Sequence, residues 1–332
     1  MTSAIPTHTI PPAMPADGSG TSAKPHAARR WTRWSLLAIL AAIIFVAQYG
    51  CVESYVFYVP TRNQIAVPTN VRELTIPTSD GLQLNAWFLP AKHATSDDGA
   101  TPQPGPAVLF CHGNGGQLAY HMQFCEFLAA RGINVLIYDY RGYGKSDLAR
   151  RERHALMLDT RAALDALRKQ PEVDHDRVGV FGMSLGGQFA TAITAEDPGV
   201  RALCTLSTFS SWRGVASDHV PLLGSILIPS GLDAVDSVAH LGDRPYLLIH
   251  GTSDNVIPVR HAYLLRDAAE KAGTPVELRI AQGGDHAMVL FNFPEERRAI
   301  EEFFTRSLAP RAASTAASTT AATAARETPA VR

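Results

Sequence analysis

The sequence has few cysteines and no motif that pairs them. Its four cysteines, at positions 51, 111, 125 and 204, lie far apart and form no CxxC pair, and no two histidines have H-x-x-x-H spacing. A disulfide scaffold needs denser cysteines, and a zinc site needs ligands at short spacing. We therefore expect no disulfide framework and no bound metal, and no motif indicates a cofactor.

The sequence also lacks an excess of positive charge. The formal net charge is −1, and no run of lysine and arginine occurs between the two ends of the chain. Binding to nucleic acid needs a clustered basic face, so we expect no nucleic-acid partner. The chain has 332 residues, of which 46% are hydrophobic. Without its unusual ends, about 250 residues remain, which suits one large α/β domain.

The two ends differ in composition from the middle. Residues 1–30 are rich in proline and small polar residues, and residues 309–332 are of low complexity, so both are predicted to be disordered. Residues 34–52 carry no charge and include an unbroken apolar run. About 20 such residues can span a bilayer, so 31–53 is predicted to be a transmembrane anchor. A cleaved or lipidated leader and a buried core helix are the alternatives.

The charges beside this apolar run predict an orientation. Arg29, Arg30 and Arg33 precede it, and Glu53 follows it. Because positive residues favour the cytoplasmic side, we expect a single-pass protein with a cytoplasmic N-terminus. The domain over 54–308 would then be periplasmic or otherwise extracytoplasmic.

Between the ends, short apolar stretches alternate with helical patterns. The stretches predicted as strands are 71–77, 82–89, 107–111, 133–138, 177–181, 200–206, 246–250 and 276–280, and the helical ones are 117–131, 152–169, 186–196, 258–272 and 295–307. Central strands without polar alternation indicate a mostly parallel sheet with helices on both faces. Only 39 residues, 207–245, separate the strands at 200–206 and 246–250, which leaves room for a short cap. Ligands of such sheets bind beyond the carboxyl ends of the strands.

A G-x-S-x-G motif occupies one of these strand ends. It runs from Gly182 to Gly186, with Ser184 between a predicted strand and a predicted helix. A sharp turn there needs small neighbours, which these glycines supply, and it would expose Ser184 as a nucleophile. The alternative is an ordinary turn from strand to helix.

An acid and a base follow later strands. Asp254 stands in the loop after 246–250, and His286 in the loop after 276–280. Serine is a weak nucleophile until an imidazole takes its proton, and a carboxylate orients that imidazole. We therefore predict that Ser184, Asp254 and His286 form a catalytic triad. Asp233 and Asp236 are weaker candidates for the acid, because no strand leads into them.

The tetrahedral intermediate of such a reaction needs N–H donors for its oxyanion. One is predicted to be the backbone N–H of Leu185, and the other that of Asn114, with Gly113 as the near alternative. HGNGG (112–116) has a second interpretation, a phosphate cradle, but it lacks the Lys-Ser/Thr ending of a P-loop. The residues predicted to support the site are His112, Gly113, Gly182 and Gly186.

Together these stretches resemble the α/β-hydrolases. The chain is more narrowly similar to the membrane-anchored α/β-hydrolase-domain family, which includes depalmitoylases and lysophospholipid hydrolases. The matching motifs are FYVPTR (57–62), FCHGNGG (110–116), YDYRGYGKS (138–146), GMSLGG (182–187), HGTSDNVIP (250–258) and GGDH (283–286). The resemblance implies a serine hydrolase with the triad named above, in which Asp139 and Arg141 are partners that hold loops near the site. STFSSW (207–212) departs from relatives that often have a proline there.

The expected function is hydrolysis of carboxylic esters or thioesters through an acyl-enzyme. The apolar stretch 220–228 lies in the predicted cap, where it would either line an acyl pocket or pack on the core. We expect a small-molecule or lipid-like acyl ester as substrate. A serine peptidase of the same fold and a non-catalytic scaffold that binds a partner are the alternatives.

Overall fold

The computed structural model describes residues 26–48, 51–92 and 103–311. The chain divides into two compact units, with the boundary between Ile43 and Ile44. The disordered segment predicted over 1–30 lies outside the described residues up to residue 25, and the tail predicted over 309–332 lies outside them from residue 312 on.

Helix α1 (His26–Gln48) occupies most of the predicted anchor. It begins inside the stretch predicted to be disordered, because His26 is followed by alanines and arginines, which favour helix. Its apolar side chains at positions 34, 36, 37, 39, 40, 43 and 45 are exposed. Across the described residues, no helix is long and apolar enough to span a membrane.

The second unit is built on an eight-stranded sheet in the order β1-β2-β4-β3-β5-β6-β7-β8. The strands are β1 (Arg72–Pro77), β2 (Gln83–Leu89), β3 (Gly105–Cys111), β4 (Asn134–Tyr138), β5 (Val173–Met183), β6 (Val200–Leu206), β7 (Tyr246–Gly251) and β8 (Val276–Ala281). Strand β2 pairs antiparallel with both β1 and β4, and all the later pairs are parallel. The predicted mostly parallel sheet is therefore confirmed.

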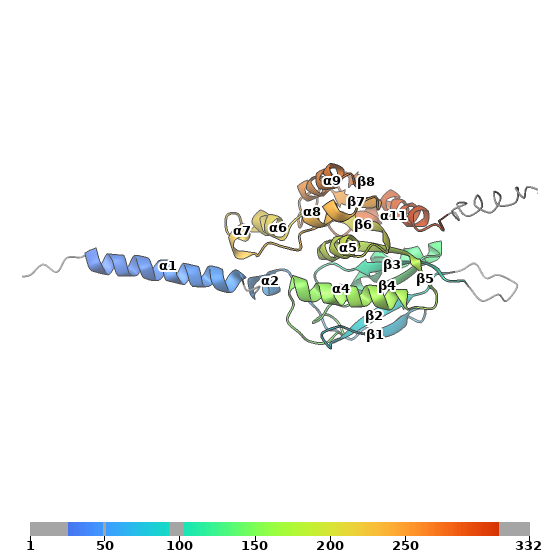
Figure 1. The fold of residues 1–332 in the computed structure, drawn as a ribbon, viewed down its shortest axis with the longest axis horizontal. Helices are drawn as coiled ribbons and strands as arrows, with labels where there is room; N and C mark the ends of the chain where they lie inside the picture. The colour runs from blue at the N-terminus through green and yellow to red at the C-terminus, as the bar shows by residue number, and fades with distance from the viewer. Residues whose placement is uncertain (1–25, 49–50, 93–102, 312–332) are drawn as a thin grey trace, which may run out of the picture. The chain divides into compact units, whose positions relative to one another are not determined.

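Helices cover both faces of this sheet, as the apolar central strands predict. One buried cluster joins the sheet to α4 (Arg153–Arg168), α5 (Leu185–Glu196) and α9 (Arg260–Ala272). A second cluster on the other face includes α10 (Val289–Asn292) and α11 (Pro294–Ser307). Figure 1 shows α4 and α5 running along the strands. The strand ends that carry the predicted site therefore stand on a rigid, two-sided core.

The helix predicted over 117–131 is broken into three pieces. They are α3 (Leu118–His121), the 3₁₀ turn η1 (Met122–Phe124) and the 3₁₀ turn η2 (Glu126–Arg131). The break falls at Cys125, whose φ of −135° leaves the helical region. Phe124 and Phe127 on either side are both buried, so tertiary packing has overridden the local helical pattern.

Short helices between β6 and β7 form the predicted cap. They are α6 (Trp212–His219), α7 (Gly224–Leu227), α8 (Ala234–Ser237) and the 3₁₀ turn η3 (Val238–His240). Figure 1 shows α6 and α7 beside each other at one end of this unit. We call α6, α7 and the loop that joins them the cap.

A buried ion pair joins α4 to α2 (Cys51–Val56) beside the cap. Arg153 donates to the Glu53 carboxylate of α2, with a shortest distance of 2.7 Å. The same guanidinium donates to the carbonyl oxygens of Pro229 and Gly231 beyond α7 and lies 4.4 Å from the Trp212 ring centroid. Because both charges are almost fully buried, breaking the pair by removing one partner would leave an uncompensated charge.

Candidate active site

Ser184 stands at a strained turn between β5 and α5. Its φ is 52°, in a region that non-glycine residues rarely occupy and that costs about 1–3 kcal/mol. The surrounding backbone holds the turn: the Ser184 N–H donates to the Leu206 carbonyl at 2.9 Å, and the Thr208 hydroxyl donates to the Ser184 carbonyl at 2.8 Å. The residue is 8% exposed, so its side chain is nearly buried.

Close approach of neighbouring backbone explains the glycines on both sides of Ser184. A Cβ on Gly186 would lie 2.0 Å from the Cys111 carbonyl oxygen, and one on Gly182 would lie 2.6 Å from the Gly186 carbonyl oxygen. These contacts are with backbone, which cannot move aside as a flexible side chain can. Any larger residue at either position would therefore push α5 away from β3 and β5.

The structure brings the three predicted triad side chains together. His286 Nε2 lies 3.0 Å from Ser184 Oγ, and His286 Nδ1 lies 2.8 Å from Asp254 Oδ2. The residues follow β5, β7 and β8, whose carboxyl ends meet at one edge of the parallel sheet. Both distances are within hydrogen-bond reach, which is the geometry that a nucleophile, a base and an orienting acid require.

The weaker candidates for the acid lie elsewhere, and the preceding histidine, His261, has its own partner. The Asp233 carboxylate accepts the N–H groups of Trp212 and Gly231, at 2.8 and 3.1 Å, so it is bonded within the connection between β6 and β7. Asp236 is exposed on α8. His261 bonds Asp218 through Nε2 at 2.8 Å.

The Asp254 carboxylate is held by donors on both oxygens. Oδ1 accepts the N–H groups of Val256 at 2.9 Å and Ile257 at 2.7 Å. Oδ2 accepts from His286 and also lies 3.2 Å from His250 Nε2. Burial raises the pKa of Asp254, but the hydrogen bonds from His250 and His286 outweigh burial and hold that pKa below the usual range for aspartate. The acid is therefore ionised across the neutral range.

The two predicted oxyanion donors lie beside Ser184. Leu185 opens α5, so its N–H is one of the first-turn donors that have no partner within the helix. The Asn114 side chain has another task, because its Oδ1 accepts the N–H of Val59 at 2.8 Å and the hydroxyl of Tyr143 at 3.0 Å. The side-chain oxygen is thus occupied, and the backbone N–H of Asn114 is the group predicted to bind the oxyanion.

His112 fixes the orientation of the loop that contains Gly113 and Asn114. Its Nδ1 lies 2.7 Å from the Gly113 carbonyl oxygen, and burial, assisted by His121, holds the pKa of His112 well below its usual range. The neutral ring must donate from Nδ1, because a carbonyl only accepts. In a trans peptide the C=O and the next N–H point in opposite directions, so the N–H of Asn114 points away from His112. A Cβ on Gly113 would lie 3.5 Å from Ser184 Cβ, which places the loop against the nucleophile.

Asp139 and Arg141 hold loops, as the resemblance implies, but they do not pair with each other. Asp139 Oδ1 accepts the N–H of Leu118 at 2.7 Å, directly after the oxyanion loop. Arg141 binds Asp80 and Asp159, with shortest distances of 2.7 Å to each. Burial raises the pKa of Asp139 to about 6, against the lowering effect of the Leu118 N–H.

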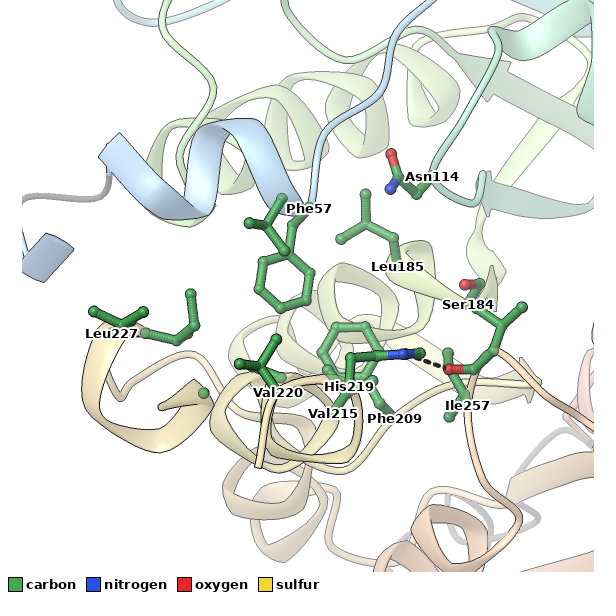
Figure 2. A pocket seen from close by; sticks show the side chains of 15 residues that line it. Phe57, Asn114, Ser184, Leu185, Phe209, Val215, His219, Val220, Leu227 and Ile257 are labelled. Carbon is green, nitrogen blue, oxygen red and sulfur yellow. Dashed lines mark hydrogen bonds between the residues drawn. The ribbon is translucent and has the colours of Figure 1, made fainter. Parts of the chain in front are cut away.

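An apolar cavity of about 360 Å³ opens beside Ser184. Its lining comes from α2, the strand ends and the cap: Val56, Phe57, Asn114, Ser184, Leu185, Phe209, Val215, Ala216, His219, Val220, Gly224, Leu227, Ile228, Val256 and Ile257. Figure 2 shows Ser184 and Leu227 at opposite ends, with Phe57 and Leu185 between them. His219 lies across the cavity, where its Nε2 is 2.9 Å from the Val256 carbonyl oxygen. The predicted stretch 220–228 thus contributes to the wall.

Sequence reasoning missed two parts of this site. Val56 and Phe57 precede the first strand and line the cavity, where Phe57 packs edge-on against Trp212 with ring centroids 5.1 Å apart. His250 opens the motif HGTSDNVIP (250–258), from which no role for this histidine follows. A histidine at the end of the strand that leads to the acid was the available signal. In the part of the chain that the structure describes, no three His, Cys, Asp or Glu side chains cluster as metal ligands would.

Comparison with known proteins places this site in a family. Residues 120–311 match the prolyl oligopeptidase family. The uncharacterised protein YfhR of Salmonella typhi is 28% identical over 264 residues, which cover 76% of this chain and 87% of YfhR.

Two solved structures share the fold. An esterase from Pyrococcus furiosus superposes with a TM-score of 0.62 at 21% identity, covering 76% of this chain and 98% of the esterase. An acylaminoacyl peptidase from Pyrococcus horikoshii superposes with a TM-score of 0.58 at 18% identity, covering 73% of this chain and 42% of the peptidase. The narrower resemblance to membrane-anchored α/β-hydrolase-domain proteins stays a prediction. The chain belongs to the prolyl oligopeptidase family and has the α/β-hydrolase fold.

Proposed function

We propose that the protein is a serine hydrolase that cleaves carboxylic esters or thioesters with an apolar acyl group. The observation that carries the proposal is the hydrogen-bonded series Ser184–His286–Asp254 at one end of an apolar cavity. The series supplies a nucleophile and a base, and the cavity supplies a place for a hydrocarbon chain. Apolar lining favours substrates by about 0.8 kcal/mol for each CH₂ group that it removes from water.

The proposed reaction runs in two halves. Ser184 Oγ attacks the acyl carbon while His286 Nε2 takes the hydroxyl proton, and the oxyanion binds the N–H groups of Leu185 and Asn114. The carbon–oxygen or carbon–sulfur bond then breaks, and His286 gives its proton to the leaving group. In the second half, water attacks the acyl-Ser184 ester, His286 accepts the proton of the water and returns it to Ser184 Oγ, and the carboxylic acid leaves.

We expect kcat/KM to rise with acyl chain length. The test is a series of p-nitrophenyl esters from acetate upwards, for which each added CH₂ should raise kcat/KM by up to about fourfold until the cavity is full. Val215→Phe, which narrows the cavity from α6, should shorten the preferred chain and leave acetate hydrolysis within about threefold of wild type. If kcat/KM of the wild type does not change with acyl chain length, the cavity does not bind the acyl group.

Leu222→Phe is the matched control for this series. Leu222 lies in the same cap but is 85% exposed and does not line the cavity. It should leave the chain-length profile unchanged. If both variants shorten the preferred chain equally, the effect comes from the cap as a whole rather than from the cavity.

A peptidase is the second candidate, and the family match favours it. Because the same triad can attack an amide, only the lining of the cavity distinguishes an ester substrate from a peptide. It offers hydrocarbon and few polar groups, whereas a peptide carries amides that need hydrogen-bond partners. Matched p-nitrophenyl esters and p-nitroanilides of one acyl or aminoacyl group separate the candidates. A peptidyl anilide that reacts as fast as its ester would favour the peptidase.

We also propose that the protein is attached to a membrane with this domain outside the cytoplasm. The support is in the sequence, in the uncharged stretch 34–52 and the three arginines before it. We expect protease added to intact spheroplasts to digest the domain. Digestion only after lysis would reverse the orientation, and recovery of the intact chain in the wash fraction would contradict attachment.

A further inference from the structure

His250 is a fully buried histidine to which the reaction described above gives no role. It stands at the end of β7, four residues before Asp254. Its Nε2 lies 2.8 Å from the Ile257 carbonyl oxygen and 3.2 Å from Asp254 Oδ2. Both neighbours are acceptors, since Asp254 is ionised, so the proton of a neutral His250 must be on Nε2.

The other ring nitrogen supports the same tautomer. His250 Nδ1 is buried and has no hydrogen-bond partner among the described residues. A proton there would be a buried donor without an acceptor and would make the ring a buried cation. The geometry therefore places the His250 proton on Nε2, which bonds the Ile257 carbonyl oxygen at 2.8 Å and also lies 3.2 Å from Asp254 Oδ2.

With His250 included, the Asp254 carboxylate has four donors. The two backbone N–H groups on Oδ1 fix that oxygen, and the two imidazoles meet at Oδ2. An ionised carboxylate offers about four lone-pair sites, so every site is filled. Without the His250 donor, Asp254 Oδ2 would be free to rotate. The negative charge of Oδ2 would then interact mainly with His286.

We propose that His250 is a positioning residue of the hydrolytic reaction, whose Nε2–H holds Asp254 Oδ2 in line with His286. This proposal rests on the proposed function, because His250 acts only through Asp254 and His286. It does not line the cavity and touches neither the substrate nor Ser184.

Other charged groups lie near His250 and Asp254, and the substitutions of His250 described below do not alter them. Arg260 and His261 of α9 pack beside it, and Asp218 of α6 binds both of them. Asp285 precedes His286 and accepts the N–H of Met288 at 2.6 Å. Among the described hydrogen bonds and ion pairs, none joins these groups to Asp254, so a change that follows replacement of His250 can be assigned to the bond it loses.

The test compares His250→Leu with His250→Gln. Leucine has a similar volume and no donor, whereas the amide nitrogen of glutamine can reach the position of Nε2. We expect His250→Leu to lower kcat on p-nitrophenyl butyrate by about ten- to a hundredfold with little change in KM. The pH of half-maximal kcat/KM on the acid side should also rise, because a carboxylate with one donor fewer stabilises the His286 cation more strongly.

His250→Gln should recover most of the wild-type kcat. It should also restore the wild-type pH of half-maximal kcat/KM on the acid side. His175→Leu is the matched control, since it makes the same change at an exposed histidine. If His250 only fills space, His250→Leu will lose stability and activity in proportion at every pH, without a shift of the acid limb, and the proposal is overturned.

Two further outcomes are distinguished by the same data. If His250→Leu does not fold, His250→Asn replaces it, because the shorter amide reaches only the Nδ1 position and should behave as a variant without the donor. Wild-type rate in a folded His250→Leu or His250→Asn overturns this proposal alone. A folded wild-type protein that hydrolyses no ester and is not labelled by a fluorophosphonate overturns the proposed function together with it.

Discussion

Replacing Ser184 by alanine is expected to abolish ester hydrolysis and to leave the melting temperature nearly unchanged. In the proposed reaction the hydroxyl is the attacking group, and its loss from a triad removes several orders of magnitude of rate, at least about a thousandfold. The fold does not depend on the hydroxyl, because its hydrogen bond is with His286 at the mouth of the cavity. Initial rates on one activated ester and a thermal melt measure both effects.

Ser207→Ala is the matched control for this variant. Ser207 directly follows β6, has a similar φ of 50° and is buried, and its hydroxyl has no hydrogen-bond partner among the described residues. It should keep nearly all of the activity. A Ser184→Ala protein that retains more than about a tenth of the wild-type rate would show that another residue is the nucleophile.

Asp254→Asn is expected to lower kcat by about ten-thousandfold. The structure gives a specific reason. The N–H groups of Val256 and Ile257 both point at Oδ1, so an asparagine must keep its oxygen there and turn its NH₂ group toward His286 and His250. His286 Nδ1 then has to accept, its proton moves to Nε2, and the ring can no longer take the proton of Ser184.

Asp236→Asn is the matched control, because it makes the same change at a surface residue. Asp236 is an exposed aspartate on α8, and its neutralisation should leave kcat within about twofold. Circular dichroism on both variants separates loss of chemistry from loss of fold. If Asp254→Asn were near wild type and Asp236→Asn or Asp233→Asn were inactive, the acid would lie in the connection between β6 and β7 and the present assignment would be wrong.

The strand ends could be predicted from the sequence because their signals are local. All eight stretches predicted as strands are strands, and Ser184, Asp254 and His286 each follow one of them. The chain order of apolar stretches does not reveal the order β2-β4-β3-β5 in the sheet, which depends on non-local pairing. Local periodicity also failed for residues 117–131, where burial on several sides replaced one helix by three short pieces.

Contacts between distant segments account for the features that the sequence did not reveal. The sequence favours the backbone N–H of Asn114 as a donor but does not show that its side chain binds Val59, 55 residues away in the chain. Phe57 lines the cavity because α2 packs under the cap, and the Glu53–Arg153 pair that supports this packing spans 100 residues. His250 is only four residues from Asp254, yet the loop that folds Ile257 back onto its ring decides which nitrogen carries the proton.

Trapping the acyl-enzyme tests the central claim most directly. The protein is mixed with an excess of a p-nitrophenyl ester, quenched in acid within the first turnover, digested and examined by mass spectrometry, with Ser184→Ala treated in parallel. We predict an acyl group on the peptide that contains Ser184 and none on the corresponding peptide of the variant. An acyl group on another residue, or hydrolysis by the wild type without any acylated peptide at early quench times, would contradict the account.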